Sequence, residues 1–401
     1  MPTGDRVPTE DSGPTRYAAP RGGPLAGTVV IDCTSVVMGP YATSLLADLG
    51  AEVVKVEPPG GDIGRRIGPT AADGLSALSL RLLRNKTSVV LDLATGEDRR
   101  RFTDLVAGAD AVVTNILPSA RERLGLDYDA LARVRPDIVL CTGQAYSSRS
   151  GLRDVSGYDD TVQALSGMAD SYRLRGGEPA YSPSITADKT CGLLMALATV
   201  SALYSRLRDG HGQWVDVPMV DNMAAFNLVE HLAGHTFDPP CGDIGWARSL
   251  APARRPHPAR DGWVCVMPYT DADWRRFLVL AGRDDLLDDP RFATAGQRGG
   301  RSDEVQAVIA DYVSGRTVAR IVSACRTARI ACAPVRTLES LADDDYLRER
   351  RTVETLEHPA VGRYRNVRLP LDFSRTPLGD DAPAPPLGGR PQGRPQDRPQ
   401  G

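Results

Sequence analysis

The sequence has little lysine, no long apolar run and no strong charge of either sign. Its 48 basic residues include only three lysines, and its formal net charge is −3. This near-neutral balance argues against binding to nucleic acid or to an acidic membrane surface. No apolar run reaches the roughly 18 residues of a membrane helix, and the N-terminus has no apolar segment of the signal-peptide kind. We therefore expect no nucleic-acid or membrane partner and a cytoplasmic location.

Patterns for metal binding and for disulfides are also missing. The seven cysteines are scattered without a C-x-x-C pair, and the five histidines show no recognisable ligand spacing. A disulfide framework needs paired cysteines, and a zinc site needs clustered ligands. We predict no metal site.

The chain does contain a regular alternation of short β-branched runs and amphipathic segments up to about residue 235. This pattern is typical of an α/β fold with a doubly wound, Rossmann-like parallel sheet. Strands are predicted at 28–32, 52–57, 88–93, 111–115, 138–142 and 213–217. Helices are predicted at 39–49, 96–107, 130–134, 159–169, 189–208 and 219–234. No G-x-G-x-x-G follows the first strand, which disfavours the usual dinucleotide site.

A change in composition separates this large domain from a smaller α+β domain. The intervening segment is rich in proline and arginine and has little periodicity, as in a linker with a long loop. A strand at 263–267 and helices at 271–281, 303–313 and 316–328 are predicted in the small domain, and residues around 352–373 are expected to return to the large sheet. The predicted parts are a disordered leader (1–22), the large domain (23–235), the linker (236–260), the small domain (261–345), a return segment (346–388) and a disordered tail (389–401).

The stretch around Asp188 allows two interpretations. Apolar residues recur at helical spacing from Leu193 to Leu207, and Gly210 ends the run, so we expect a largely buried helix that begins within a residue or two of Asp188. Asp188 could be an ordinary N-cap that accepts bonds from backbone N–H groups. It could instead be a carboxylate nucleophile, because an unperturbed Asp has a pKa near 3.9 and is ionised at neutral pH. The helix end would then offer N–H donors to an oxyanion.

Several short motifs, in their joint order and spacing, resemble the class III CoA-transferases, the CaiB/BaiF group that also includes formyl-CoA transferases and 2-methylacyl-CoA racemases. The match covers about 25–388. The motifs that carry it are Met38–Ala42, Leu46–Glu57, Asn85–Leu93, Arg123–Tyr128, Gly157–Asp159, Gln163–Gly167, Ala187–Asp188, Gly210–Val217 and Ala384–Gly388.

The resemblance implies that Asp188 is the nucleophile of a CoA-transferase. CoA would move from an acyl-CoA to a free carboxylic acid through an acyl-aspartyl anhydride and an aspartyl-CoA thioester. No cofactor is implied beyond CoA itself as substrate and product. The resemblance also implies a homodimer, in which linkers near 220–260 and 335–350 close each chain into a ring that interlocks with its partner.

By the same analogy, CoA would lie along the carboxyl ends of the strands. The implied contacts are Val37, Met38, Leu91, Asp92, Leu93, Ala94, Asn115, Arg123, Gln144 and Tyr146. Arg123 suits a phosphate because its guanidinium is a forked cation, although an exposed arginine at a helix end is also common. The family's F-G-x-x-G-P loop is replaced here by the residues from Gln144 to Gly151. Tyr158 is expected in the substrate pocket.

Two other functions stay open from the sequence. A racemase needs an acid/base group on each face of the α-carbon, and the racemases of this family carry a His where this chain has Tyr158. A phenol with a pKa near 10 is a poor base at neutral pH, which favours transfer over isomerisation. A CoA-binding accessory protein without turnover is the third possibility, and the presence of Asp188 argues against it. The sequence does not identify the donor or the acceptor acid.

Overall fold

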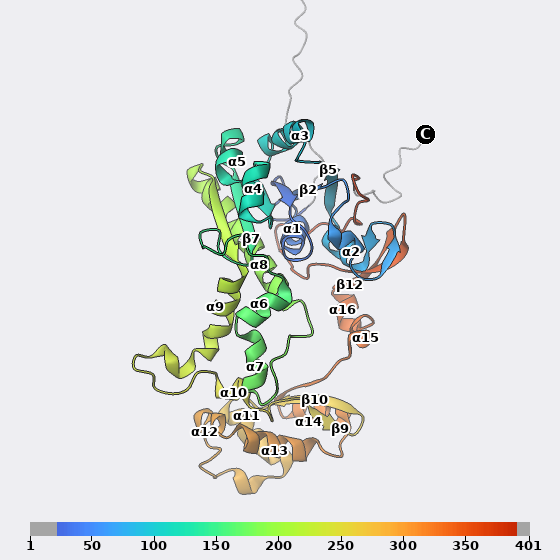
Figure 1. The fold of residues 1–401 in the computed structure, drawn as a ribbon. Coiled ribbons are helices and arrows are strands. Elements are labelled where there is room, and N and C mark those ends of the chain that lie inside the picture. The colour runs from blue at the N-terminus through green and yellow to red at the C-terminus, as the bar shows by residue number, and fades with distance from the viewer. Residues whose placement is uncertain (1–21, 391–401) are drawn as a thin grey trace, which may run out of the picture. The chain divides into compact units, whose positions relative to one another are not determined.

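The computed structural model describes residues 22–390, which divide into two compact units (Figure 1). The first unit holds residues 22–162, 184–223 and 345–390, and the second holds 163–183 and 224–344. Except for Gly22, Gly389 and Arg390, the predicted disordered leader and tail lie outside the described residues.

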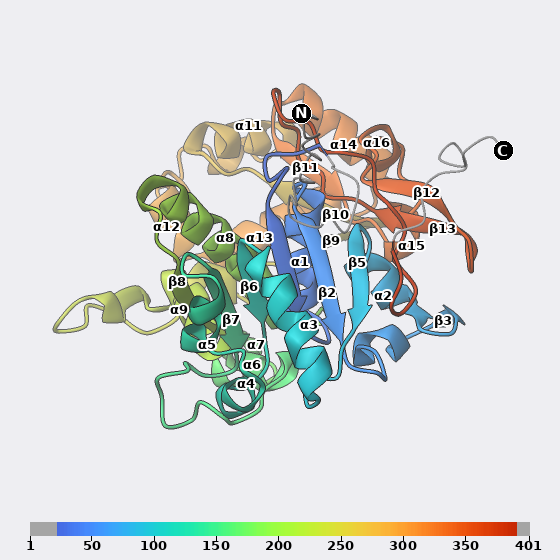
Figure 2. The same ribbon diagram turned by 90° about the horizontal axis from the view of Figure 1, so that it is seen from above.

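A parallel sheet forms the centre of the first unit. Its six strands, in chain order, are β1 (Val29–Cys33), β2 (Glu52–Glu57), β5 (Lys86–Val90), β6 (Ala111–Thr114), β7 (Val139–Gln144) and β8 (Gln213–Pro218). They lie side by side in the order β5-β2-β1-β6-β7-β8, and every neighbouring pair is parallel (Figure 2). The strand order therefore reverses between β1 and β6, as in doubly wound folds. The predicted parallel α/β sheet is confirmed.

Helices cover both faces of this sheet. They include α1 (Met38–Asp48), α3 (Gly96–Ala107), α5 (Tyr128–Val134) and α8 (Thr186–Asp209). Successive strand residues point to opposite faces. On one face, Leu140 of β7 belongs to the core that contains Phe102 of α3 and Leu131 of α5. On the other face, the thiol of Cys141 lies 3.7 Å from the carbonyl oxygen of Met195 in α8. The helices α1 and α8 pack against each other on that second face.

Helix α8 differs from its prediction in one respect. It begins two residues before Asp188, as expected, but it is not largely buried. Leu193, Leu197, Tyr204 and Leu207 are all exposed, and their spacing places them on one face of the helix. By length and composition alone, α8 could cross a membrane, although buried residues such as Cys191 and Met195 pack in the first unit as those of a core helix do.

The remaining elements of the first unit are short. They are η1 (Ile63–Arg66), β3 (Thr70–Ala72), β4 (Leu75–Ser76), α2 (Ala77–Leu82), α4 (Pro118–Leu124), α16 (Asp345–Glu349), β12 (Val353–His358) and β13 (Gly362–Val367). The expectation that residues around 352–373 return to the large sheet is wrong, because β12 and β13 form a separate antiparallel hairpin. Only three residues separate the two strands, so they pair with each other. Two helices cross the boundary between the units: α6 (Asp159–Leu165) and α9 (Met219–His231).

The second unit has its own antiparallel sheet and hydrophobic core. The strands are β9 (His257–Ala259), β10 (Gly262–Met267) and β11 (Ala331–Pro334), in the order β11-β10-β9. The helical elements are α7 (Met168–Leu174), η2 (Ala233–Thr236), α10 (Ala247–Leu250), α11 (Asp271–Ala281), η3 (Asp284–Leu286), α12 (Ala295–Gly299), α13 (Ser302–Val313), α14 (Val318–Thr327) and α15 (Leu338–Leu341). The core centres on Trp274, Phe277 and Tyr312, whose rings contact one another or Phe292. The predicted strand and helices of this part are confirmed to within about two residues.

Candidate functional site

A pocket of about 220 Å³ opens at the point where the strand order reverses. Doubly wound folds bind ligands at this position, beyond the carboxyl ends of the strands. The residues that line the pocket are Ser35, Val36, Val37, Met38, Asn115, Leu117, Gly143, Gln144, Ala145, Ser156, Gly157, Tyr158, Asp188 and Met219. Six residues singled out in the sequence therefore meet in one cavity: Val37, Met38, Asn115, Gln144, Tyr158 and Asp188.

The loop after β1 is held in an unusual conformation. Val36 has a φ of 71°, which branched side chains rarely adopt. Two polar side chains hold the loop there. The amide of Asn115 accepts a bond from the Ser35 N–H (2.8 Å) and donates one to the Ser35 carbonyl (2.9 Å), while Asp62 accepts from the Val36 N–H at 3.1 Å. Asn115 lines the pocket, but both ends of its amide are used to position this loop.

A buried cluster of ions lies directly behind the loop. The ammonium of Lys86 contacts the Asp32 carboxylate at 2.9 Å and the Thr43 hydroxyl at 2.7 Å, and Lys55 contacts Asp62 at 3.0 Å and the carbonyl of Thr34. Burial alone would raise the pKa of Asp32, but the two lysines and two hydroxyls outweigh it and hold that pKa well below its usual range. Two of the three lysines in the chain are thus part of the scaffold that fixes the loop.

Asp188 lies in the first turn of α8, but it does not cap that helix. The N-cap position is Ile185, and no side chain caps it there. The carboxylate of Asp159 accepts the bond from the Asp188 N–H at 2.9 Å, so the capping oxygen comes from α6. The N-cap interpretation of Asp188 is therefore not supported.

Helix α8 also packs closely against α1. Gly192 allows this approach, since a Cβ at that position would lie 2.7 Å from the carbonyl oxygen of Met38.

The carboxyl group of Asp188 is in an environment that disfavours its charge. Burial, followed by repulsion from Asp159 and Asp160, raises the pKa of Asp188 to about 7. Among residues 22–390, no lysine or arginine forms an ion pair with it, and the ammonium of the adjacent Lys189 turns to the Ser184 hydroxyl at 2.7 Å. The expectation of a fully ionised Asp at neutral pH needs correction, because burial and like charges were not visible in the sequence.

A hydrogen-bonded network fixes Gln144 at the floor of the pocket. Its amide nitrogen donates to Ser148 Oγ and to Asp216 Oδ1, both at 2.8 Å, and its oxygen accepts from Arg121 at 3.3 Å. Arg121 is buried and also donates to Ser148 Oγ at 3.0 Å. This role of Arg121, Ser148 and Asp216 is not visible in the sequence, since their contacts join segments that are distant in the chain.

Other predicted CoA contacts lie outside this pocket: Leu91, Asp92, Leu93, Ala94, Arg123 and Tyr146. The Leu91 side chain is buried in the core and so faces away from solvent, and its backbone N–H donates to the Glu57 carbonyl. Arg123 is exposed on α4, in contrast to the buried Arg121 two residues earlier. Tyr158 does line the pocket, and the residue is 66% exposed.

Comparison with known proteins points to one family. A family model described as CoA-transferase family III matches residues 25–390. The chain is 31% identical to a succinate–glutarate CoA-transferase of Agrobacterium fabrum, covering 91% of this chain and 93% of that protein. It is also 31% identical to an acetyl-CoA:oxalate CoA-transferase of Acetobacter aceti, covering 80% and 82%. A CaiB/BaiF family protein from Brucella suis has a similar crystal structure, with a TM-score of 0.77, 26% identity and coverage of 92% of this chain and 97% of that one.

Proposed function

Since the chain belongs to CoA-transferase family III, we propose that it moves CoA from an acyl-CoA to a free short-chain carboxylic acid, with Asp188 as the covalent nucleophile. The observation that carries the proposal is the position of this carboxyl group. It lies in the pocket at the reversal of strand order, it does not cap its helix, and no cation of the described chain neutralises it. A carboxylate without a structural task is available for chemistry.

The proposed reaction exchanges acyl groups without loss of the thioester bond. The ionised Asp188 attacks the thioester carbonyl, which gives an acyl-aspartyl anhydride and releases the CoA thiolate. The thiolate then attacks the aspartyl carbonyl, so that an aspartyl-CoA thioester forms and the donor acid leaves. The acceptor carboxylate repeats these two steps in reverse order, and Asp188 is regenerated as the new acyl-CoA departs. The raised pKa keeps the Asp188 carboxylate basic, and hence nucleophilic, once it is ionised.

An interlocked homodimer is part of the proposal. Helix α8 has an exposed apolar face, which contains Leu193, Leu197, Tyr204 and Leu207. This face supports the proposed dimer, because a partner subunit would cover it. Scattered exposed apolar residues are common, but a continuous helical face of them is typical of an interface. Light scattering should give about twice 43.0 kDa across dilution. A monomer that retains activity would contradict this part.

Transfer is tested by supplying the enzyme with acyl-CoAs and free acids and identifying new thioesters by mass spectrometry. The expected result is exchange of CoA that depends on both substrates. Hydrolysis alone, or no reaction with any pair, would contradict the proposed function.

A racemase would behave differently in deuterium oxide. Isomerisation exchanges the α-proton without any acceptor acid, and it needs a second base near Asp188. The residue in the relevant position is the exposed Tyr158. We expect no α-deuterium in a 2-methylacyl-CoA, whereas rapid deuteration without an acceptor acid would favour the isomerase.

A further inference from the structure

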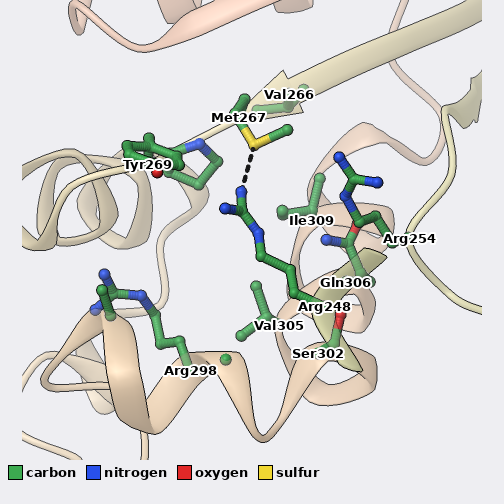
Figure 3. Close-up of a pocket in the computed structure, with 13 residues that line it drawn as sticks. Arg248, Arg254, Val266, Met267, Tyr269, Arg298, Ser302, Val305, Gln306 and Ile309 are labelled. Carbon is green, nitrogen blue, oxygen red and sulfur yellow. Dashed lines mark hydrogen bonds between the residues drawn. The ribbon is translucent and has the colours of Figure 1, made fainter. Parts of the chain in front are cut away.

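The second unit contains a pocket that is rich in guanidinium groups (Figure 3). Three arginines line it, and Figure 3 draws Arg254 and Arg298 on either side of Arg248. The remaining lining residues are Val266, Met267, Pro268, Tyr269, Ala295, Gly299, Ser302, Val305, Gln306 and Ile309. No aspartate or glutamate is among them, so the walls carry positive charge only.

Two of the three arginines have no carboxylate partner in the described residues 22–390. Arg248 stacks over the Tyr269 ring at 5.0 Å and donates to the Met267 sulfur at 3.5 Å. Sulfur is a weak acceptor, and a guanidinium has five N–H donors, so most of the donors on Arg248 stay available. The side chain of Arg254 forms no ion pair or hydrogen bond with these residues. Arg298, by contrast, is buried and donates to Asp271 (2.6 Å) and to the Phe292 carbonyl (2.8 Å).

One face of helix α13 also lines this pocket. Ser302, Val305, Gln306 and Ile309 follow the helical spacing, and the acidic neighbours Asp303 and Glu304 are not among the lining residues. His257 donates to the side-chain oxygen of Gln306 at 2.9 Å, which orients that amide and leaves its NH₂ group as a neutral donor. The wall therefore combines apolar side chains with hydrogen-bond donors.

We propose that this pocket binds a short-chain dicarboxylate. Arg248 and Arg254 would each take one carboxylate through charge-assisted hydrogen bonds, and the methylene groups would contact Val305, Ile309 and Tyr269. The cavity is about 180 Å³. This is below the roughly 300 Å³ at which pockets for drug-sized ligands begin, so the cavity suits a compact acid. The proposal rests on this pocket alone and does not require the transfer reaction.

The test is isothermal titration of the full-length protein, without CoA, with glutarate, butyrate and inorganic phosphate. We expect glutarate to bind most tightly, because butyrate lacks the second carboxylate and phosphate lacks the apolar body. The variant R248Q/R254Q should weaken glutarate binding at least about tenfold, since each arginine supplies charge-assisted bonds. R255Q is the matched control, because Arg255 is exposed and does not line the pocket, and it should keep the original affinity.

The proposal would be overturned by no binding of glutarate at millimolar concentration, by equal binding of phosphate, or by equal losses in R255Q. Thermal melting checks that each variant is folded. If the double variant does not fold, R254Q alone still tests the pocket, because no described side-chain contact depends on Arg254. The variant D188N should bind glutarate as the parent does, and loss of binding there would place the ligand in the Asp188 pocket instead. Failure of this proposal and failure of the transfer reaction are thus distinguishable.

Discussion

The Asp188 pocket of the first unit (the acidic pocket) and the Arg248 pocket of the second unit (the arginine pocket) carry opposite charge. The pocket of the first unit holds Asp188, whose pKa is raised by burial and by Asp159 and Asp160, while the pocket of the second unit is lined by Arg248, Arg254 and Arg298. A carboxyl group whose ionised form is disfavoured by its surroundings is suited to forming a covalent bond. Guanidinium groups, by contrast, bind anions without reacting with them. The acidic pocket is therefore a candidate reaction centre, and the arginine pocket is a candidate binding site.

The largest effect is expected from D188N, which removes the proposed nucleophile of the acidic pocket. We expect transfer to fall by at least about 10³-fold, because no other group that lines the pocket can form the anhydride.

The same variant should keep its fold. The ionised Asp188 costs folding free energy that is absent below about pH 4 and fully present above about pH 7, so D188N should melt at a higher temperature than the parent at pH 8, with the difference fading near pH 4. Transfer activity in D188N close to that of the parent would show that Asp188 is not the nucleophile.

The second effect concerns the scaffold behind the acidic pocket. K86M should lower the free energy of unfolding by about 3–5 kcal/mol, because it leaves the buried Asp32 without its closest cation. Urea denaturation measures this change. K189M is the matched control, since Lys189 is exposed and its ammonium donates to the exposed Ser184 hydroxyl, and its stability should be nearly that of the parent. Equal stability of the two variants would mean that the buried ion pair does not hold the loop.

Local sequence patterns account for part of this fold and of the candidate site. The parallel sheet could be predicted from local runs of apolar residues. The family resemblance placed Val37, Met38, Asn115 and Gln144 along the carboxyl ends of the strands and indicated Tyr158 and Asp188 as site residues, and the structure brings these six into one pocket. The raised pKa of Asp188 could not be predicted, because it depends on burial and on α6, which places Asp159 against the start of α8.

The arginine pocket shows the same limit more strongly. Arg248 and Arg254 lie in a proline-rich segment without periodicity, which gave no indication that they face α13. Arg121 is a second example. The family resemblance indicated Arg123 as the phosphate contact, but the fold buries Arg121 against Gln144 and leaves Arg123 exposed. Contacts between distant segments decide which of several similar side chains lies in a site.

The third effect is a pH dependence that belongs to the acidic pocket. Protonated Asp188 cannot attack, so kcat/KM for transfer should fall about tenfold per pH unit below about pH 7 and level off above it. Circular dichroism at each pH confirms that the fold is retained. A flat profile between pH 5 and 8 would indicate that the Asp188 carboxyl is ionised throughout this range.

The smallest effect is expected from D160N. Removal of one negative charge near Asp188 lowers the pKa of that carboxyl, so the acid limb of the pH profile should move to lower pH. Asp160 is exposed and its charge is screened by water, so we expect a shift of less than about one unit. D129N, which also removes an exposed carboxylate, is the control and should leave the limb in place. A shift to higher pH in D160N would contradict the electrostatic account.

Isotope transfer into Asp188 tests the central claim most directly. The acceptor acid is supplied with ¹⁸O in its carboxylate, and the peptide that contains Asp188 is weighed after turnover. In the proposed reaction, the acceptor oxygen bridges the second anhydride and stays on Asp188 when the CoA thiolate attacks the acceptor carbonyl. The account therefore predicts ¹⁸O in the Asp188 carboxylate of the active enzyme. Formation of the new acyl-CoA without any ¹⁸O in that peptide would contradict it.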